Sequence, residues 1–151
     1  MEWVRRLFGT VVGLDSAPLI YFVEAHPLYR PHLRPFFEAV DHGNIRVVTS
    51  TVTLTEVLVH PLRYANLPLA MQYSNILLHS LNVTTSPVTA EMATHAAKIR
   101  AAHGLKTPDA IQLAAAQEAN ATAFLTNDRG LSAPLGIQVL VLDDILAGKQ
   151  H

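Results

Sequence analysis

The sequence predicts an α/β fold in which helices cover both faces of a parallel sheet. Short apolar runs rich in β-branched residues alternate along the chain with segments that begin like helices. Parallel strands need crossovers long enough to hold a helix, so this alternation favours a parallel sheet. The chain has 151 residues, of which 50% are hydrophobic and 15% charged, and one folded domain over 1–151 is expected.

Each expected element rests on a local signal. Strands are expected where short apolar, β-branched runs lie between turn-forming residues. In chain order these runs are 10–14, 45–49, 82–85, 122–126 and 137–141. Helices are expected where apolar residues recur between helix start and stop signals. In chain order these segments are 16–24, 50–60, 67–81, 90–103 and 107–120.

Several residues are expected to set helix boundaries. Ser16 is expected to cap the first of these helices and Thr107 the last, where Pro108 and an acid follow in the first turn. Pro61 is expected to limit the helix after the second strand. Gly104 is expected to close the helix 90–103. Breaks or further helix starts are marked by Pro27, Pro31 and Pro35.

Composition and motif searches exclude several classes of function. The 11 basic and 12 acidic residues give a net charge of −1, so a nucleic acid must be held by a local site. The lack of cysteine removes thiolate nucleophiles and cysteine zinc sites. The sequence contains no H-x-x-x-H pair and no G-x-S-x-G or P-loop motif. Asp15 and Pro18 interrupt the apolar N-terminal stretch, so a cytoplasmic protein without a membrane span is expected.

Four of the 12 acidic residues are expected at one edge of the sheet. In an open α/β sheet the carboxyl ends of the strands and the N-termini of the helices share the edge where ligands bind. Asp15 and Asp128 directly follow the first and fourth expected strands. Glu56 lies in the first turns of the helix after the second strand, and Asp109 lies at a helix start. The connectivity therefore predicts that these four carboxylates lie together.

Such a cluster points to a bound cation. Converging carboxylates repel one another and raise each other's pKa unless a cation neutralises them. Oxygen-only ligands favour Mg²⁺ or Mn²⁺ over zinc, and such an ion suits phosphodiester hydrolysis. Each acid also has a structural alternative: Asp15 as a cap, Glu56 in a Thr53-x-x-Glu56 capping box, Asp109 as a first-turn acid and Asp128 as a turn residue.

Four motifs resemble one known family. They are VVGLDSAPLIYFVE, TSTVTLTEVL, KTPDAIQLAAA and AFLTNDRGL, and they lie in this order between residues 10 and 143. Together they resemble the PIN-domain family, specifically the VapC-like toxins. The resemblance implies a three-layer α/β/α sandwich with a short, mostly parallel central sheet. It also implies a ribonuclease that cleaves RNA with Mg²⁺ or Mn²⁺ as the toxin of a type II toxin–antitoxin pair.

The resemblance further assigns residues and partners. The ions would be held by Asp15, Glu56, Asp109 and Asp128, with the hydroxyls of Ser16 and Thr126 in supporting positions. The expected partners are a second copy in a homodimer and an antitoxin whose C-terminal segment lies over the acidic groove.

Basic residues are the candidates for binding the phosphates of a nucleic acid, and an apolar stripe is a candidate for binding another protein chain. Arg129, next to Asp128, is the first candidate for phosphate binding, and the further candidates are Arg63, Arg100 and Lys106. An apolar stripe is interpreted either as ordinary core or as a dimer or partner interface; its residues are Tyr64, Leu67, Met71, Tyr73, Ile76 and Leu77. Two other functions stay open at this point. One is a PIN-like binding module without catalysis, and the other is a nuclease or phosphatase that acts on another phosphate ester.

Overall fold

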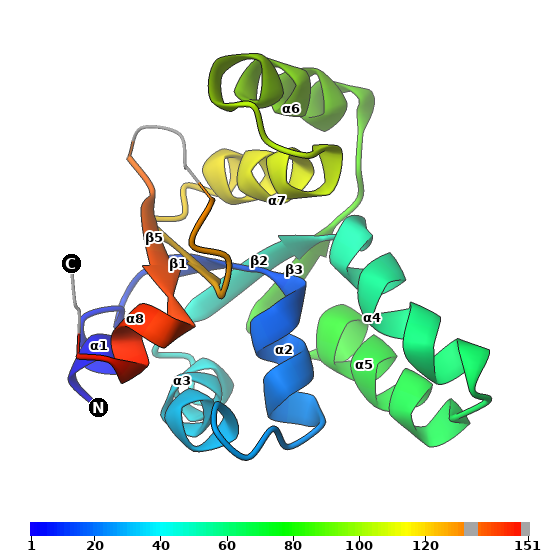
Figure 1. Ribbon diagram of the computed structural model, residues 1–151, viewed down its shortest axis with the longest axis vertical. Helices are drawn as coiled ribbons and strands as arrows, with labels where there is room; N and C mark the ends of the chain where they lie inside the picture. The colour runs from blue at the N-terminus through cyan, green and yellow to red at the C-terminus, as the bar shows by residue number, and fades with distance from the viewer. Residues whose placement is uncertain (132–135, 149–151) are drawn as a thin grey trace.

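Five parallel strands form one sheet through the middle of the molecule (Figure 1). The structure is a computed structural model, and it describes residues 1–131 and 136–148. The strands are β1 (Val11–Leu14), β2 (Arg46–Ser50), β3 (Val83–Ser86), β4 (Ala123–Thr126) and β5 (Gln138–Val141). They lie in the order β3-β2-β1-β4-β5, and each neighbouring pair is parallel. All five expected strands are therefore confirmed, and β1 is central.

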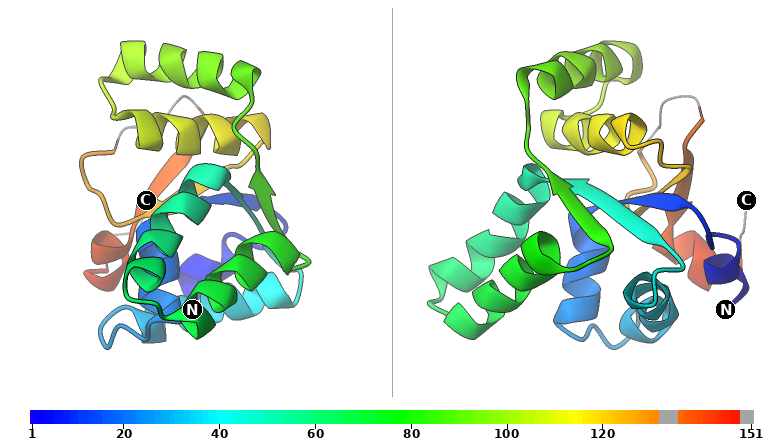
Figure 2. Two further views of the ribbon diagram at one scale, coloured as in Figure 1. Left: turned by 90° about the vertical axis from the view of Figure 1, so that its right-hand side faces the viewer. Right: turned by 180° about the vertical axis from the view of Figure 1, so that it is seen from behind.

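Helices cover both faces of this sheet, which confirms the predicted three-layer α/β/α sandwich. The helices are α1 (Glu2–Arg5), α2 (Ser16–Val23), α3 (Arg30–Asp41), α4 (Thr51–Arg63), α5 (Leu67–His79), α6 (Ala90–His103), α7 (Thr107–Glu118) and α8 (Leu142–Leu146). Both views of Figure 2 place the α6–α7 pair on one side of the sheet and the α4–α5 pair on the other. Across the residues described, no helix combines the length and apolar character that a membrane span requires.

The hydrophobic core consists of two clusters, one on each face. The larger cluster packs side chains of α1 to α5 and α8 against one face of the sheet, and its Phe36 and Leu125 are fully buried. The smaller cluster packs the alanine-rich α7 and α6 against Val48 and Phe124 on the other face. Alternate residues along a strand point to opposite faces, so both clusters draw on the same strands.

Two helix caps differ from the sequence prediction. Asp15, and not Ser16, caps α2, because its carboxylate accepts a hydrogen bond from the backbone N–H of Ser16, the first helical residue. Lys106 precedes α7, so Thr107 is the first residue of that helix rather than its cap. Pro108 then lies in the first turn, where a residue without an N–H leaves fewer donors to satisfy. Gly104 closes α6 with φ 67°, as predicted.

Two prolines lie inside helices rather than at their ends. Pro61 was expected to limit its helix, but α4 continues to Arg63. Pro61 is itself buried, so packing outweighs the loss of one helical hydrogen bond. Pro35 lies within α3, a helix that its neighbours stabilise by burying Leu33 and Phe36 completely. The sequence prediction did not include α1, α3 or α8, although Pro31 does lie in the first turn of α3.

Candidate functional site

The four predicted carboxylates come from four elements that meet at one edge of the sheet. Asp15 follows β1, Asp128 follows β4, Glu56 lies in α4 and Asp109 lies in the first turn of α7. Burial raises the pKa of Asp109 above its ordinary value, and the charges of the other three carboxylates raise it further. The nearby Lys106 lowers it by a smaller amount. Electrostatics of this kind act at short range, so the other three carboxylates lie near enough to influence Asp109.

Asp15 is held at both of its carboxylate oxygens. Its Oδ1 accepts a hydrogen bond from the backbone N–H of Ser16 at 2.8 Å, and its Oδ2 accepts one from the hydroxyl of Thr126 at 2.7 Å. The second bond crosses from β1 to β4, which pair through Leu14 and Leu125. Because Thr126 is fully buried, this contact fixes the orientation of the Asp15 side chain.

Glu56 is oriented by a residue 40 positions earlier in the chain. The hydroxyl of Ser16 donates a hydrogen bond to Glu56 Oε1 at 2.6 Å. Ser50, not Thr53, caps α4 by accepting a hydrogen bond from the N–H of Val52, so the capping-box alternative for Glu56 is wrong. Glu56 is exposed, and its carboxylate remains available to a ligand.

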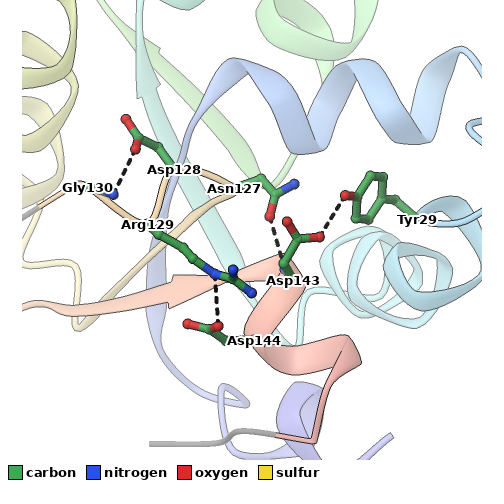
Figure 3. A network of polar contacts seen from close by, with 7 residues as sticks. All are labelled: Tyr29, Asn127, Asp128, Arg129, Gly130, Asp143 and Asp144. Carbon is green, nitrogen blue, oxygen red and sulfur yellow. Dashed lines mark hydrogen bonds and ion pairs between the residues drawn. The ribbon is translucent and has the colours of Figure 1, made fainter.

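Asp128 lies in a tight turn after β4 (Figure 3). Its Oδ1 accepts a hydrogen bond from the N–H of Gly130 at 2.9 Å, which agrees with its expected turn conformation. The hydroxyl of Thr126 accepts a hydrogen bond from the N–H of Asp128 at 3.1 Å. The hydroxyl of Thr126 therefore forms hydrogen bonds with both Asp15 and Asp128, so it can orient two of the four carboxylate residues.

Arg129 points away from this cluster. Its Nε lies 3.2 Å from Asp144 Oδ1, and Figure 3 shows its side chain directed to Asp144 while Asp128 points to Gly130. The side chain of Arg129 is 61% exposed, so this ion pair contributes little to stability. The other basic candidates also differ from one another. Arg100 donates to the carbonyl of Leu105 at 2.6 Å, whereas Lys106 is close enough to influence Asp109.

Two polar networks behind this edge were missed by the sequence analysis. The buried Thr49, Thr53 and Gln112 are joined by contacts of 2.5 to 3.0 Å, and Thr49 also donates to the carbonyl of Leu14 at 2.9 Å. This network ties β1, β2, α4 and α7 together just behind the carboxylates. A glutamine within an otherwise apolar helix, AIQLAAA, was the available signal.

The second network contacts Asn127, which lies next to Asp128 in the turn after β4. Tyr29 donates a hydrogen bond to Asp143 Oδ1 at 2.6 Å, and the N–H of Asp143 donates to Asn127 Oδ1 at 3.0 Å (Figure 3). The hydrogen bond to Asp143 raises the pKa of Tyr29. The network connects β4, α8 and the start of α3, three segments that are far apart in sequence.

The donor set fits a hard divalent cation. Asp109 forms no hydrogen bond or ion pair through its side chain with any residue that the structure describes, and the charges of three other carboxylates act on it. Within the described ranges, no group of three or more His, Asp or Glu side chains is arranged closely enough to hold a metal ion as it stands. Mg²⁺ keeps several water ligands and commonly uses only one or two carboxylates directly. A hydrated ion is therefore compatible with this more open arrangement.

The apolar stripe, which runs from Tyr64 at the end of α4 into α5, contains both buried and exposed residues. Tyr73 and Leu77 are buried in the core, which supports the simpler interpretation for them. Tyr64, Leu67 and Met71 are each more than 60% exposed, and they leave an apolar surface on the α4–α5 pair.

Comparisons with known proteins identify the family and the fold. A family model described as the PIN domain matches residues 12–134. No curated protein matches the sequence. VapBC2 from Rickettsia felis, solved bound to a DNA fragment from its promoter, is 14% identical with a TM-score of 0.64, over 87% of this chain and 98% of that one.

Two further solved structures share the fold. VapC20 from Mycobacterium tuberculosis, a toxin that cleaves the sarcin–ricin loop, is 18% identical with a TM-score of 0.62, over 76% of this chain and 87% of that one. A toxin–antitoxin complex from Klebsiella pneumoniae is 20% identical with a TM-score of 0.59, over 85% of this chain and 95% of that one.

Proposed function

Because the chain belongs to the PIN-domain family, we propose that it is a Mg²⁺- or Mn²⁺-dependent endoribonuclease and the toxin of a type II toxin–antitoxin pair. The observation that carries the proposal is the placement of Asp15 and Asp128 after β1 and β4 and of Glu56 and Asp109 in α4 and α7, where the charges of the other three act on Asp109. An acidic cluster without a cation is costly, so its presence at the ligand-binding edge favours a metal-dependent function. The structural similarity to a toxin that cleaves an RNA loop supports RNA as the substrate.

Asp15, Glu56, Asp109 and Asp128 would hold the ion in this proposal. A bound Mg²⁺ or Mn²⁺ would neutralise charge on the phosphate and lower the pKa of a bound water. The surrounding residues set the orientation of the carboxylates: Thr126 fixes Asp15, and Ser16 fixes Glu56. Lys106, which influences Asp109, and Arg129, once released from Asp144, are the basic candidates for contact with phosphate.

The supporting role of Thr126 can be measured. Replacing Thr126 with valine removes the hydroxyl that donates to Asp15 while keeping the side-chain shape. Loss of such a supporting contact is expected to weaken Mn²⁺ binding about 10- to 100-fold. The affinity would be read from the rise in thermal unfolding midpoint across a Mn²⁺ titration. Thr126→Ser keeps the hydroxyl and should bind Mn²⁺ like the wild type; equal affinity in the valine variant would remove Thr126 from the site.

The proposed function is tested with the purified full chain. It is incubated with a structured RNA, a single-stranded DNA and p-nitrophenyl phosphate, each with Mn²⁺ and with EDTA. Cleavage of RNA alone, lost in EDTA, is the expected result. Turnover of DNA or of the phosphate monoester instead would favour the alternative phosphoesterase. Lack of turnover on all three substrates would favour the binding module without catalysis.

We also propose an antitoxin partner that covers the acidic edge. The similar chain from Klebsiella pneumoniae was solved in a toxin–antitoxin complex, which supports such a partner. The cluster of carboxylates would attract a basic side chain of that partner, because opposite charges are favoured where water is excluded.

A homodimer through the exposed apolar residues of the α4–α5 pair is the second proposed assembly. Tyr64, Leu67 and Met71 are 67%, 61% and 64% exposed, and an apolar patch of this kind suits a self-complementary interface. The wild type is expected to elute as a dimer in size-exclusion chromatography with light scattering, and the Leu67→Glu, Met71→Glu variant as a monomer. Leu28→Glu, which places a charge at an exposed leucine elsewhere, should remain dimeric. A monomeric wild type would contradict this proposal.

A further inference from the structure

Basic side chains gather where the loop after α2 leads into α3. They line an open pocket of about 380 Å³, the α3 pocket, whose walls are Ala25, His26, Pro27, Arg30, Pro31 and Arg34. None of these described residues is acidic. Arg30 and Arg34 form no ion pair within the part of the chain that the structure describes. The α3 pocket therefore carries positive charge that its own surroundings do not neutralise.

Arg30 is held in place by its neighbours in the fold. Its Nε donates a hydrogen bond to the carbonyl of Phe22 at 3.0 Å, and its guanidinium lies over the Phe22 ring, 5.1 Å from the ring centroid. These contacts leave the terminal nitrogens of the guanidinium without a partner among the described residues. Guanidinium N–H groups match the oxygens of a phosphate, and a side chain that is already fixed loses little freedom on binding.

His26 adds a neutral hydrogen-bond donor to the same pocket. Its Nδ1 accepts a hydrogen bond from the backbone N–H of Leu28 at 3.2 Å, so the proton of the neutral ring lies on Nε2. The ring packs against Tyr21 and Tyr29, with centroids 5.1 and 4.7 Å from theirs, which fixes its orientation. Its Nε2 forms no hydrogen bond with residues in the described ranges. The pocket thus offers one N–H and two guanidinium groups to an anion.

A series of contacts links the α3 pocket to the acidic edge. His26 packs against Tyr29, whose hydroxyl donates a hydrogen bond to Asp143 at 2.6 Å. The N–H of Asp143 in turn donates to Asn127, the neighbour of Asp128 in the turn after β4 (Figure 3). A single phosphate cannot occupy both places. A nucleic acid with one phosphate at the carboxylates can pass over Tyr29 and place another in the pocket.

We propose that the α3 pocket binds a backbone phosphate of the RNA, away from the bond that is cleaved. This inference rests on RNA being the substrate of the proposed function. The net charge of −1 gives no general attraction for a polyanion, and the carboxylates repel one until a cation binds. Such a substrate therefore needs a separate basic contact. Contacts with backbone phosphates position a nucleic acid without reading its sequence, so the pocket sets the path of the RNA and not the cleavage sequence.

RNA binding without cleavage tests the pocket on the full chain. The anisotropy of a labelled single-stranded RNA of about 12 nucleotides is measured over a range of salt concentrations in EDTA, where the metal-dependent reaction cannot proceed. Each phosphate contact with a single strand contributes about 0.7 to the slope of log affinity against log salt. Arg34→Gln should therefore lower the slope by about 0.7, and the Arg30→Gln, Arg34→Gln variant by about 1.4. The affinity should fall up to about fivefold for each arginine removed, as for exposed ion pairs.

A variant with the same change in charge is the matched control. Arg46→Gln, Lys98→Gln removes two exposed basic side chains, one at the start of β2 and one on α6. The start of β2 lies at the edge opposite the carboxylates, and α6 packs on the other face of the sheet from α3. This variant should keep the wild-type slope. Because Arg34 is exposed and has no partner in the described ranges, Arg34→Gln reports on the pocket even if loss of the Arg30 contacts disturbs the fold.

Three results would overturn the proposal: a wild type that binds no RNA, an Arg34→Gln variant with the wild-type slope, or a control variant that loses as much slope as the double pocket variant. Displacement of the RNA by polyglutamate of equal charge as readily as by unlabelled RNA would assign the pocket to an acidic protein segment and would also overturn it. Cleavage in Mn²⁺ is measured separately. RNA that binds through the two arginines but is not cleaved would contradict the proposed nuclease and support this pocket.

Discussion

Replacing Asp109 with asparagine is expected to stabilise the metal-free protein at neutral pH and to abolish its stabilisation by Mn²⁺. Burial and the charges of Asp15, Asp128 and Glu56 raise the pKa of Asp109 above 3.8, so ionised Asp109 destabilises the folded state. The neutral amide removes that cost and also removes a ligand. For the wild type, an ion present at 100 times its Kd should add about 2.7 kcal/mol to the free energy of unfolding.

The pH dependence of this effect follows from the direction of the pKa shift. The folded state binds the Asp109 proton more tightly than the unfolded state, so stability falls as pH rises from below 3.8 through the folded pKa. The stability gained by Asp109→Asn should therefore grow over that interval and stay constant above it. Thermal melts from pH 3 to 8 in EDTA measure it. Asp41→Asn is the control, because Asp41 is exposed at the end of α3 and is absent from the causes of the Asp109 shift. A variant that still responds to Mn²⁺ would contradict the assignment of Asp109.

Gly13→Ala is expected to be among the most destabilising single substitutions in the sheet. Gly13 lies in the central strand β1, where a Cβ would come within 2.6 Å of the Phe124 ring and 2.8 Å of the Ala116 Cβ. Both neighbours are buried, so the strand and α7 would have to move apart. Overpacking of this kind costs about 1–3 kcal/mol in the free energy of unfolding. Urea denaturation of the purified variant measures the loss.

A double-mutant cycle shows whether close approach is the cause. Ala116→Gly alone should destabilise α7 by about 1 kcal/mol, because glycine is a poor helix former. In the presence of Gly13→Ala, the same change relieves one of the two close contacts and should cost less, or even stabilise the protein. Strictly additive effects would show that the steric contact with Ala116 is unimportant. Gly136→Ala is not a suitable comparison, since its φ of 94° introduces backbone strain instead.

The fold was accessible from the sequence because its strands carry strong local signals. Runs such as 122–126 are short, apolar and bounded by turn residues, and their alternation with helices determines the parallel arrangement. Connectivity alone then placed Asp15 and Asp128 at one edge. Helix boundaries were harder to predict. Proline usually ends a helix, but Pro61 and Pro35 lie inside helices because tertiary packing outweighs that local preference.

Contacts between distant segments explain most of what the sequence could not predict. The hydrogen bond from Ser16 to Glu56 joins residues 40 positions apart, and the bond from Tyr29 to Asp143 joins residues 114 apart. Neither pair has a local pattern that would reveal it. Arg129 was expected near phosphate because it follows Asp128, but neighbours in a turn point in different directions, and Arg129 pairs with Asp144. Its role in phosphate binding stays a prediction.

The most direct test of the central claim is the rate at which the Asp15→Asn variant cleaves RNA in Mn²⁺. Asparagine keeps one acceptor oxygen, which can retain one of the two hydrogen bonds that Asp15 accepts from Ser16 and Thr126, so the fold should persist. Asp41→Asn removes an exposed carboxylate at the end of α3, outside the proposed site, and serves as the control. We expect a rate at least about 10²-fold below the wild type for Asp15→Asn, similar to the loss of one electrostatic stabiliser, and a near-normal rate for the control. RNA cleavage at the wild-type rate by Asp15→Asn would show that Asp15 does not hold the ion.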